Sequence, residues 1–214
     1  MSANPDLLDR CIAEFDAALR TLSGSPERSI GRPAPGPTTG DDQLTGSERD
    51  RAARLMRVNH AGEISAQALY RGQALVAGDP ALRADLLRAA AEEHDHLAWC
   101  ATRTRELGQD VSLLAPAWYA GSFAIGVAAG LAGDHRSLGF LAETERQVCE
   151  HLDGHLGQLP AADGTSRAIV GQMRAEELAH QRHAEDQGGA ELPLPLRLGM
   201  RAAARVMTTV AHYL

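Results

Sequence analysis

The sequence predicts an all-α protein built as an antiparallel four-helix bundle, with accessory helices at the N-terminus, in the middle and at the C-terminus. Of its 214 residues, 38 are alanine, the strongest helix former, and only eight are aromatic. Residues that favour strands are correspondingly scarce, and several long segments repeat apolar residues at intervals of three and four. These observations argue against an all-β fold.

Two N-terminal segments are expected to precede the main domain. Residues 1–22 should form an amphipathic helix, because their large apolar side chains recur at helical spacing (Leu8, Ile12, Phe15 and Leu19). Residues 23–47 hold four prolines and five glycines, a composition typical of a linker that is mobile or draped over the surface. The bundle domain is expected to occupy residues 48–214.

Capping residues and breakers divide this domain into long helices. Ser47 followed by Glu48 resembles an N-cap with an acidic first turn. The run 78–80, Gly-Asp-Pro, supplies a C-cap, an N-cap and a first-turn proline. Pro160 ends a further helix, and Asp163 opens the next one. The four bundle helices are therefore expected at about 47–77, 80–107, 134–159 and 163–187.

Two accessory segments have unusual composition. Residues 111–133 contain no charge and no histidine. An uncharged stretch of this length could span a membrane, but 11 of these 23 residues are alanine or glycine. That content favours a close-packed or interfacial helix over a span. Residues 196–214 should form the last helix, in which Arg197, Arg201 and Arg205 recur every four residues without an acid nearby in the sequence. Both segments could form a lipid-facing wall, or pack against the bundle or a second copy of the chain.

Charge and cysteine content limit the function classes. The net charge of −7 argues against a nucleic-acid-binding protein. The three cysteines are odd in number and widely spaced, so we expect no disulfide framework and a reducing compartment (Cys11, Cys100, Cys149). Acidic residues interrupt the N-terminal apolar stretch, so we expect no signal peptide and an intracellular protein (Asp6, Asp9, Glu14).

Two Glu-x-x-His motifs carry the chemistry, and each places a carboxylate and an imidazole on one helix face (Glu93 with His96, Glu177 with His180). Glu63 precedes Glu93 by 30 residues, with the Gly-Asp-Pro turn halfway between them. Glu145 precedes Glu177 by 32 residues, with the loop after Pro160 halfway. In an antiparallel hairpin, residues equidistant from the turn lie level with each other. Two such hairpins would bring four glutamates and two histidines together.

Four buried carboxylates require counter-charge, since each buried unpaired ion costs several kcal/mol. Two divalent cations would supply it, and oxygen and imidazole ligands without thiolates favour iron or manganese over zinc. This ligand set is already known from di-iron and di-manganese bundles. The alternative is that all six residues are ordinary surface side chains. His60 and His151 could hydrogen-bond the ligands, whereas surface positions are expected for His94, His155 and His183, and simple packing for Cys149.

The residues that carry these motifs resemble the demethoxyubiquinone hydroxylases, which are ferritin-like di-iron monooxygenases of ubiquinone biosynthesis. The resemblance extends over about residues 47–214 and rests on four runs: 57–63 (Arg-Val-Asn-His-Ala-Gly-Glu), 93–96 (Glu-His-Asp-His), 143–145 (Glu-Thr-Glu) and 176–180 (Glu-Glu-Leu-Ala-His). It implies six metal ligands, namely Glu63, Glu93, His96, Glu145, Glu177 and His180. Leu152 stands where family members often have a tyrosine, so a role for that tyrosine does not carry over.

The resemblance also implies an activity and its partners. It implies ring hydroxylation of a polyprenylated demethoxyquinol, with two iron ions as cofactor, manganese as the less favoured metal, and O₂ as co-substrate. It implies a peripheral position on the cytoplasmic side of the cell membrane, an external reductant such as NADH or a reductase, and a homo-oligomer or a complex with other ubiquinone-biosynthesis proteins. No nucleic-acid partner is expected. Other ferritin-like proteins share such ligands, so a peroxidase, a manganese catalase, a tRNA hydroxylase and an iron store remain alternatives, as does a bundle without metal.

Overall fold

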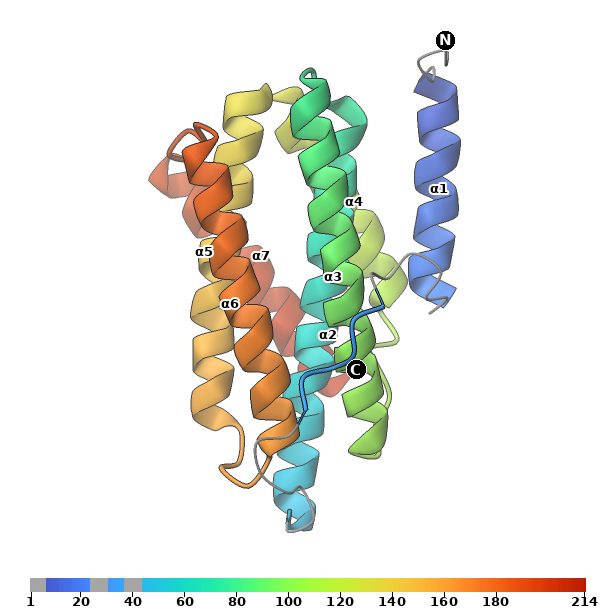
Figure 1. Cartoon of the computed structure of the whole chain (residues 1–214), viewed down its shortest axis with the longest axis vertical. Coiled ribbons are helices and arrows are strands. Elements are labelled where there is room, and N and C mark those ends of the chain that lie inside the picture. Colours follow the sequence, from blue (N-terminus) through green and yellow to red (C-terminus); the bar gives the residue numbers. More distant parts are fainter. Residues whose placement is uncertain (1–6, 24–30, 37–43) are drawn as a thin grey trace.

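Helices make up most of the computed structural model, which describes residues 7–23, 31–36 and 44–214 and contains no strand within these ranges. Four long helices run side by side as the predicted antiparallel bundle (Figure 1). They are α2 (Gly46–Val76), α3 (Pro80–Glu106), α5 (Asp134–Gln158) and α6 (Gly164–Asp186). The all-α, ferritin-like bundle predicted from the sequence is therefore confirmed.

Three of the four bundle helices begin at a side-chain cap, whereas α5 begins after Gly133 without one. Asp79 and Asp163 accept hydrogen bonds from Ala81 and Ser166 as the N-caps of α3 and α6, as predicted. The expected cap of α2 was wrong by two residues, because Thr45 and not Ser47 is the N-cap. Thr45 and Glu48 form a reciprocal capping box, which satisfies two backbone donors instead of one.

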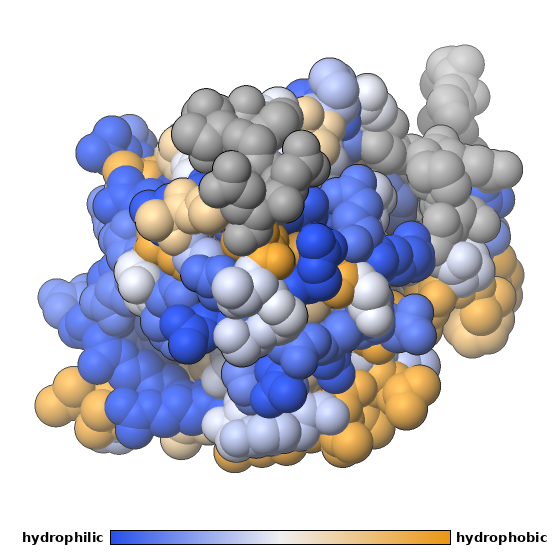
Figure 2. Space-filling view, turned by 90° about the horizontal axis from the view of Figure 1, so that it is seen from below, coloured by the Kyte–Doolittle hydropathy of each residue, from blue (hydrophilic) through white to orange (hydrophobic). Residues whose placement is uncertain are grey.

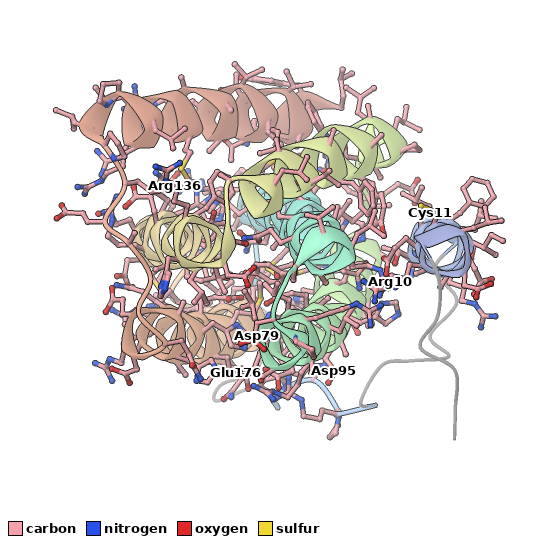
Figure 3. All side chains as sticks on the ribbon, turned by 90° about the horizontal axis from the view of Figure 1, so that it is seen from above. Arg10, Cys11, Asp79, Asp95, Arg136 and Glu176 are labelled. Carbon is pink, nitrogen blue, oxygen red and sulfur yellow. The ribbon has the colours of Figure 1, made fainter. Side chains whose placement is uncertain are left out.

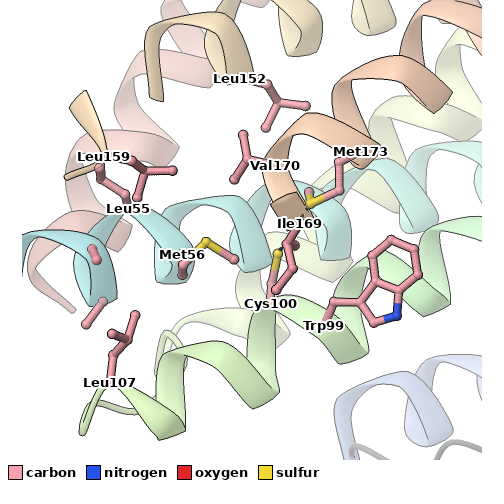
Figure 4. Packing of buried hydrophobic residues seen from close by; sticks show 12 residues of the cluster. Leu55, Met56, Trp99, Cys100, Leu107, Leu152, Leu159, Ile169, Val170 and Met173 are labelled. Carbon is pink, nitrogen blue, oxygen red and sulfur yellow. Dashed lines mark hydrogen bonds between the residues drawn. The ribbon is translucent and has the colours of Figure 1, made fainter. Parts of the chain in front are cut away.

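One half of the hydrophobic core fills the end of the bundle farthest from the α2–α3 turn. Figure 4 shows its members reaching inward from all four bundle helices, with Met56 and Trp99 facing Ile169 and Met173. A second cluster, which includes Tyr70, Leu86 and Phe140, fills the other end. Between the two clusters the packing is polar, and the middle of the bundle carries the predicted ligands.

Helix α4 (Ala115–Leu131) packs along α2 at very short distance. A β-carbon at Gly126 would overlap the carbonyl oxygen of Leu69, and one at Gly72 would overlap that of Phe123. The glycines of the uncharged segment thus permit close backbone approach, as the prediction of a close-packed helix requires. Among the described helices, none has the length and apolarity that a bilayer crossing demands.

The remaining helices lie on the outside of the bundle. Helix α1 (Leu7–Ser23) is held to α2 by an ion pair between Glu14 and Arg71 at 2.6 Å. Helix α7 (Leu194–Tyr213) packs on α2 and α5, and acidic side chains of α5 lie beside two of its arginines. Arg197 lies 3.3 Å from Glu143 and Arg201 lies 3.2 Å from Glu150, because tertiary packing supplies acids that the local sequence does not.

The predicted division of the chain into an N-terminal helix (1–22), a linker (23–47) and a bundle domain (48–214) remains a prediction. Much of the 23–47 segment lies outside the described residues, but residues 31–36 form an extended strap across α3 and α6 (Figure 1). This part of the segment is draped over the bundle, as expected. Its side-chain contacts are described below, because they reach the polar centre.

Candidate metal centre

The structure brings all six predicted ligands to the middle of the bundle. One group contains Glu63 of α2, Glu93 and His96 of α3, and Glu177 of α6. The other contains Glu145 of α5 with Glu177 and His180 of α6. Within each group, one potential ligand atom per residue lies within 4.8 Å of all the others. Five of the six residues are buried, and His180 is nearly so.

Two of the carboxylates serve both histidines. The Nδ1 atom of His96 lies 3.0 Å from Glu93 and 3.2 Å from Glu177. The Nδ1 atom of His180 lies 3.2 Å from Glu177 and 3.4 Å from Glu93. Glu93 and Glu177 therefore lie near both imidazoles, whereas Glu63 belongs to one candidate metal-binding group and Glu145 to the other.

Two glutamates that sequence reasoning missed hold the outer edges of the imidazoles. His96 donates from Nε2 to Glu176 at 2.6 Å, and His180 donates from Nε2 to Glu92 at 2.6 Å. Each glutamate directly precedes the glutamate of the other Glu-x-x-His motif. These bonds fix the ring orientations and leave both Nδ1 atoms directed at the centre, as second partners of metal-binding histidines do. The repeated Glu-Glu pair, 84 residues apart, was the available signal.

The carboxylate oxygens at the centre lack enough partners within the protein. Buried oxygens of all four glutamates, including both of Glu145, have no hydrogen-bond partner among the described residues. Buried polar atoms are rarely left unsatisfied, and unpaired charge is costlier still. Two divalent cations would satisfy these oxygens, so the residues present fit a di-metal pair.

The same burial perturbs the protonation of the centre. Burial raises the pKa of Glu63 and of Glu145 well above the ordinary carboxyl value. Burial alone would lower the pKa of both histidines, but the hydrogen bonds and charges of the surrounding carboxylates raise it by more. The pKa of His96 therefore lies well above its ordinary value, and that of His180 rises to about 12. Without metal, protons therefore balance the charge that cations would otherwise neutralise.

Three further histidines lie near the centre or its cavity, namely His60, His151 and His155. The ring centroids of His151 and His155 lie 3.9 Å apart with the rings tilted by 56°. His155 is buried and its Nδ1 lies 2.7 Å from Asn59, so the expected surface position of His155 is wrong. Burial lowers the pKa of His60 to about 4. His60 Nδ1 and His151 Nε2 have no partner among the described residues, so their predicted hydrogen bonds to ligands remain untested.

Three further side chains complete the predictions outside the ligands. His183 is exposed as expected, but His94 is half-buried and its Nδ1 lies 3.1 Å from Gln67. Cys149 is buried with a free thiol, in agreement with simple packing.

A large cavity opens beside the centre, between α2, α4, α5 and α7. Its volume is about 880 Å³, within the usual range for sites that hold small organic ligands. Glu63 lines it together with apolar side chains such as Ile125, Phe140 and Met207. Polar residues such as Asn59 and Thr144 also line it, but most of the wall surface is apolar. One ligand carboxylate therefore borders a mostly apolar chamber.

Comparisons with known proteins agree with this arrangement. Residues 50–211 match the family described as ubiquinone biosynthesis protein COQ7. The chain is 56% identical to the 3-demethoxyubiquinol 3-hydroxylase of Ralstonia pickettii, over 96% of this chain and 99% of that protein. It is 57% identical to the enzyme of the same name from Burkholderia ambifaria, over 97% and 100% of the two chains. The chain belongs to the COQ7 family of ubiquinone biosynthesis proteins.

Proposed function

We propose that the protein is a 3-demethoxyubiquinol 3-hydroxylase, an O₂-dependent monooxygenase that hydroxylates the ring of a polyprenylated demethoxyquinol in ubiquinone biosynthesis. The observation that carries this proposal is the apolar cavity of about 880 Å³ bordered by Glu63, a member of the metal-binding group. Peroxidation of small polar substrates or storage of iron would not require an apolar chamber of this size beside the ligands. The name and high identity of the relatives support the same activity.

Two iron ions would be held by the six predicted ligands. Glu63, Glu93 and His96 would bind one ion, and Glu145, Glu177 and His180 the other, with the two central glutamates near both. When bound, the iron pair supplies the redox chemistry that activates O₂. The chain supplies fixed imidazoles, four carboxylates that neutralise the ions, and a buried site that excludes water. Electrons would come from an external donor such as NADH or a reductase.

The cavity would hold the quinol with its ring toward Glu63. Small residues of α4 and the apolar face of α7 would accommodate the prenyl chain, because both helices contribute to the wall. Thr144 and His151 are among the wall residues that could hydrogen-bond the ring oxygens. Apolar enclosure with few polar contacts is the usual design of a site for an amphipathic small molecule.

The outer helices would place this cavity on the cytoplasmic face of the cell membrane. The large hydrophobic side chains that are exposed in the described residues all lie on or next to α1, α4 and α7. Figure 2 shows apolar side chains along one margin and on the side where Figure 1 places α1, while the centre of this face is hydrophilic. Exposed apolar patches of this kind mark lipid or protein interfaces. Arg201 and Arg205, at the cavity rim, would meet anionic head groups.

Vesicle flotation tests the membrane proposal. The protein should float with anionic liposomes, and replacing Phe15, which is 68% exposed, by serine should weaken flotation without lowering the melting temperature. Arg174→Gln, which alters an exposed ion pair between α6 and Asp153 of α5, is the control and should float like the wild type. Equal flotation of the Phe15 variant and the control would show that α1 does not bind the membrane. No flotation of the wild type would refute the membrane proposal.

Glu145→Gln tests the metal assignment and the activity together. Glu145 is fully buried with two unsatisfied oxygens, so the variant should lose at least one bound iron per chain and its quinol hydroxylation. Asp153→Asn on the same helix is the matched control, since that side chain is 52% exposed, pairs with Arg174 and belongs neither to the metal-binding groups nor to the cavity wall. Full iron content and undiminished hydroxylation in the Glu145 variant would refute the assignment, and manganese as the bound metal would favour the catalase alternative.

A further inference from the structure

The strap, residues 31–36, is attached to the bundle at a buried carboxylate. Asp95 of α3 has no solvent exposure and accepts hydrogen bonds from the Gly31 amide at 3.1 Å and from Arg32 Nε at 2.8 Å. The indole of Trp99 donates to the Arg32 carbonyl at 3.0 Å, and the guanidinium lies 5.0 Å from the indole ring. Gly31 has a φ of 72°, which glycine adopts without strain. The prolines at 33 and 35 lower the entropic cost of holding the strap extended.

Arg32 also reaches the outer partner of one histidine. Its two terminal nitrogens donate to the two oxygens of Glu176, at 2.6 and 3.0 Å. Glu176 Oε2, which accepts the 3.0 Å bond, also accepts the 2.6 Å bond from His96. Figure 3 shows Asp95 and Glu176 on the same side of the bundle, where the strap crosses. A continuous chain of hydrogen bonds therefore runs from the strap through Glu176 to the His96 ring.

The other histidine has a different environment. Glu92, the counterpart of Glu176, lines a cavity of about 170 Å³ together with Asp85 and His183, which lie 3.3 Å apart. The two halves of the centre match in their ligands and in the glutamate behind each imidazole. They differ one step farther out, because an arginine fork holds Glu176 and a cavity borders Glu92.

We propose that Arg32 is a positioning residue that fixes His96 through Glu176 and so makes the two metal positions unequal. This inference rests on the metal assignment proposed above. A carboxylate held at both oxygens by a planar fork cannot rotate away from the imidazole. The ion bound by His96 is therefore held more tightly than the ion bound by His180. The strap, outside the bundle, sets this difference.

Ferrous ion titrated anaerobically into the metal-free full-length chain tests the proposal. Arg32→Gln removes the fork but keeps a donor, and Arg32→Lys keeps the charge but not the planar geometry. Arg174→Gln is the matched control. Arg174 lies on the same helix as Glu176 and makes a similar two-bond contact, with Asp153 of α5, but at an exposed site. Binding of each iron is followed by competition with a chelator and by Mössbauer spectra of iron-57. Thermal unfolding of the metal-free variants reports the structural effect separately.

Arg32→Gln should weaken one of the two irons by up to about 10-fold, the lower end of the effect of losing an outer partner of a histidine ligand, because Glu176 itself stays in place. One of the two ferrous Mössbauer signals should change, Arg32→Lys should restore part of the affinity, and Arg174→Gln should match the wild type. If the wild type binds two irons and Arg32→Gln binds both with unchanged affinity and spectra, the role of Arg32 is refuted while the metal assignment stands. If the wild type binds none, the metal assignment fails and the role of Arg32 with it.

Discussion

Metal binding at this centre should release protons from the buried ligand groups. At pH 6.5 the raised pKa values leave His96 and His180 carrying their second proton, which gives two protons to displace. Glu63 and Glu145 can add one each, because burial raises the pKa of both carboxyls. A metal ligand must be deprotonated, so two divalent ions should displace between two and four protons per chain.

The sign of the pH dependence follows directly. Protons compete with the cations, so affinity should rise with pH. With two to four protons displaced, the overall binding constant for the pair should increase by about 10²–10⁴-fold per pH unit near pH 6.5. The strength of this dependence distinguishes a buried carboxylate centre from a surface site, where exposed carboxylates are already ionised at that pH.

Calorimetric titration of ferrous ion in buffers of different ionisation enthalpy measures the released protons. Glu150→Gln is the control, because that exposed side chain lies outside the centre and the variant should release as many protons as the wild type. Release of fewer than about one proton per chain, or an affinity that does not change between pH 6.5 and 7.5, would refute this account of the metal-free centre.

Two further predictions concern the fold. Gly126→Ala should destabilise the chain by about 1–3 kcal/mol, because the added carbon overlaps the α2 backbone. Gly121→Ala on the same helix meets no atom within 4 Å and should stabilise by about 0.5–1 kcal/mol. Urea unfolding measures both, and equal stabilities would contradict the close approach of α2 and α4. Thr45→Ala should cost about 0.5–2 kcal/mol through loss of the α2 cap. Ser47→Ala should change stability by less than about 0.5 kcal/mol. A larger loss of stability in the Ser47 variant than in the Thr45 variant would indicate that Ser47 is the cap.

The bundle and its candidate metal ligands were predictable from the sequence because the signals are local. Helical composition, the caps at Asp79 and Asp163, and the i, i+3 spacing of each Glu-x-x-His motif depend only on neighbouring residues. The level of Glu63 with Glu93 follows from their equal distance from a tight turn. The error at Thr45 is of the same local kind, since Thr45 and Ser47 are both good caps and only the contact with Glu48 selects one.

Contacts between segments distant in the sequence were not predictable in this way. The burial of His155 depends on Asn59 of another helix, and the acids beside Arg197 and Arg201 come from α5. The strap could be expected to lie on the surface, but its composition alone could not indicate which groups it binds. Each of these contacts depends on where two remote side chains meet after the helices have packed.

The sequence by itself determined the helices, the pairing of helices through short turns and the identity of six candidate ligands. Periodicity, capping and spacing along one chain are sufficient for these features. Only the tertiary structure decided that Glu93 and Glu177 lie between the two histidines, that Glu92 and Glu176 hold the imidazoles, and that Arg32 reaches Glu176. The reason is physical: a hydrogen bond between remote segments depends on distances of a few tenths of an ångström, which helix packing sets and local sequence does not.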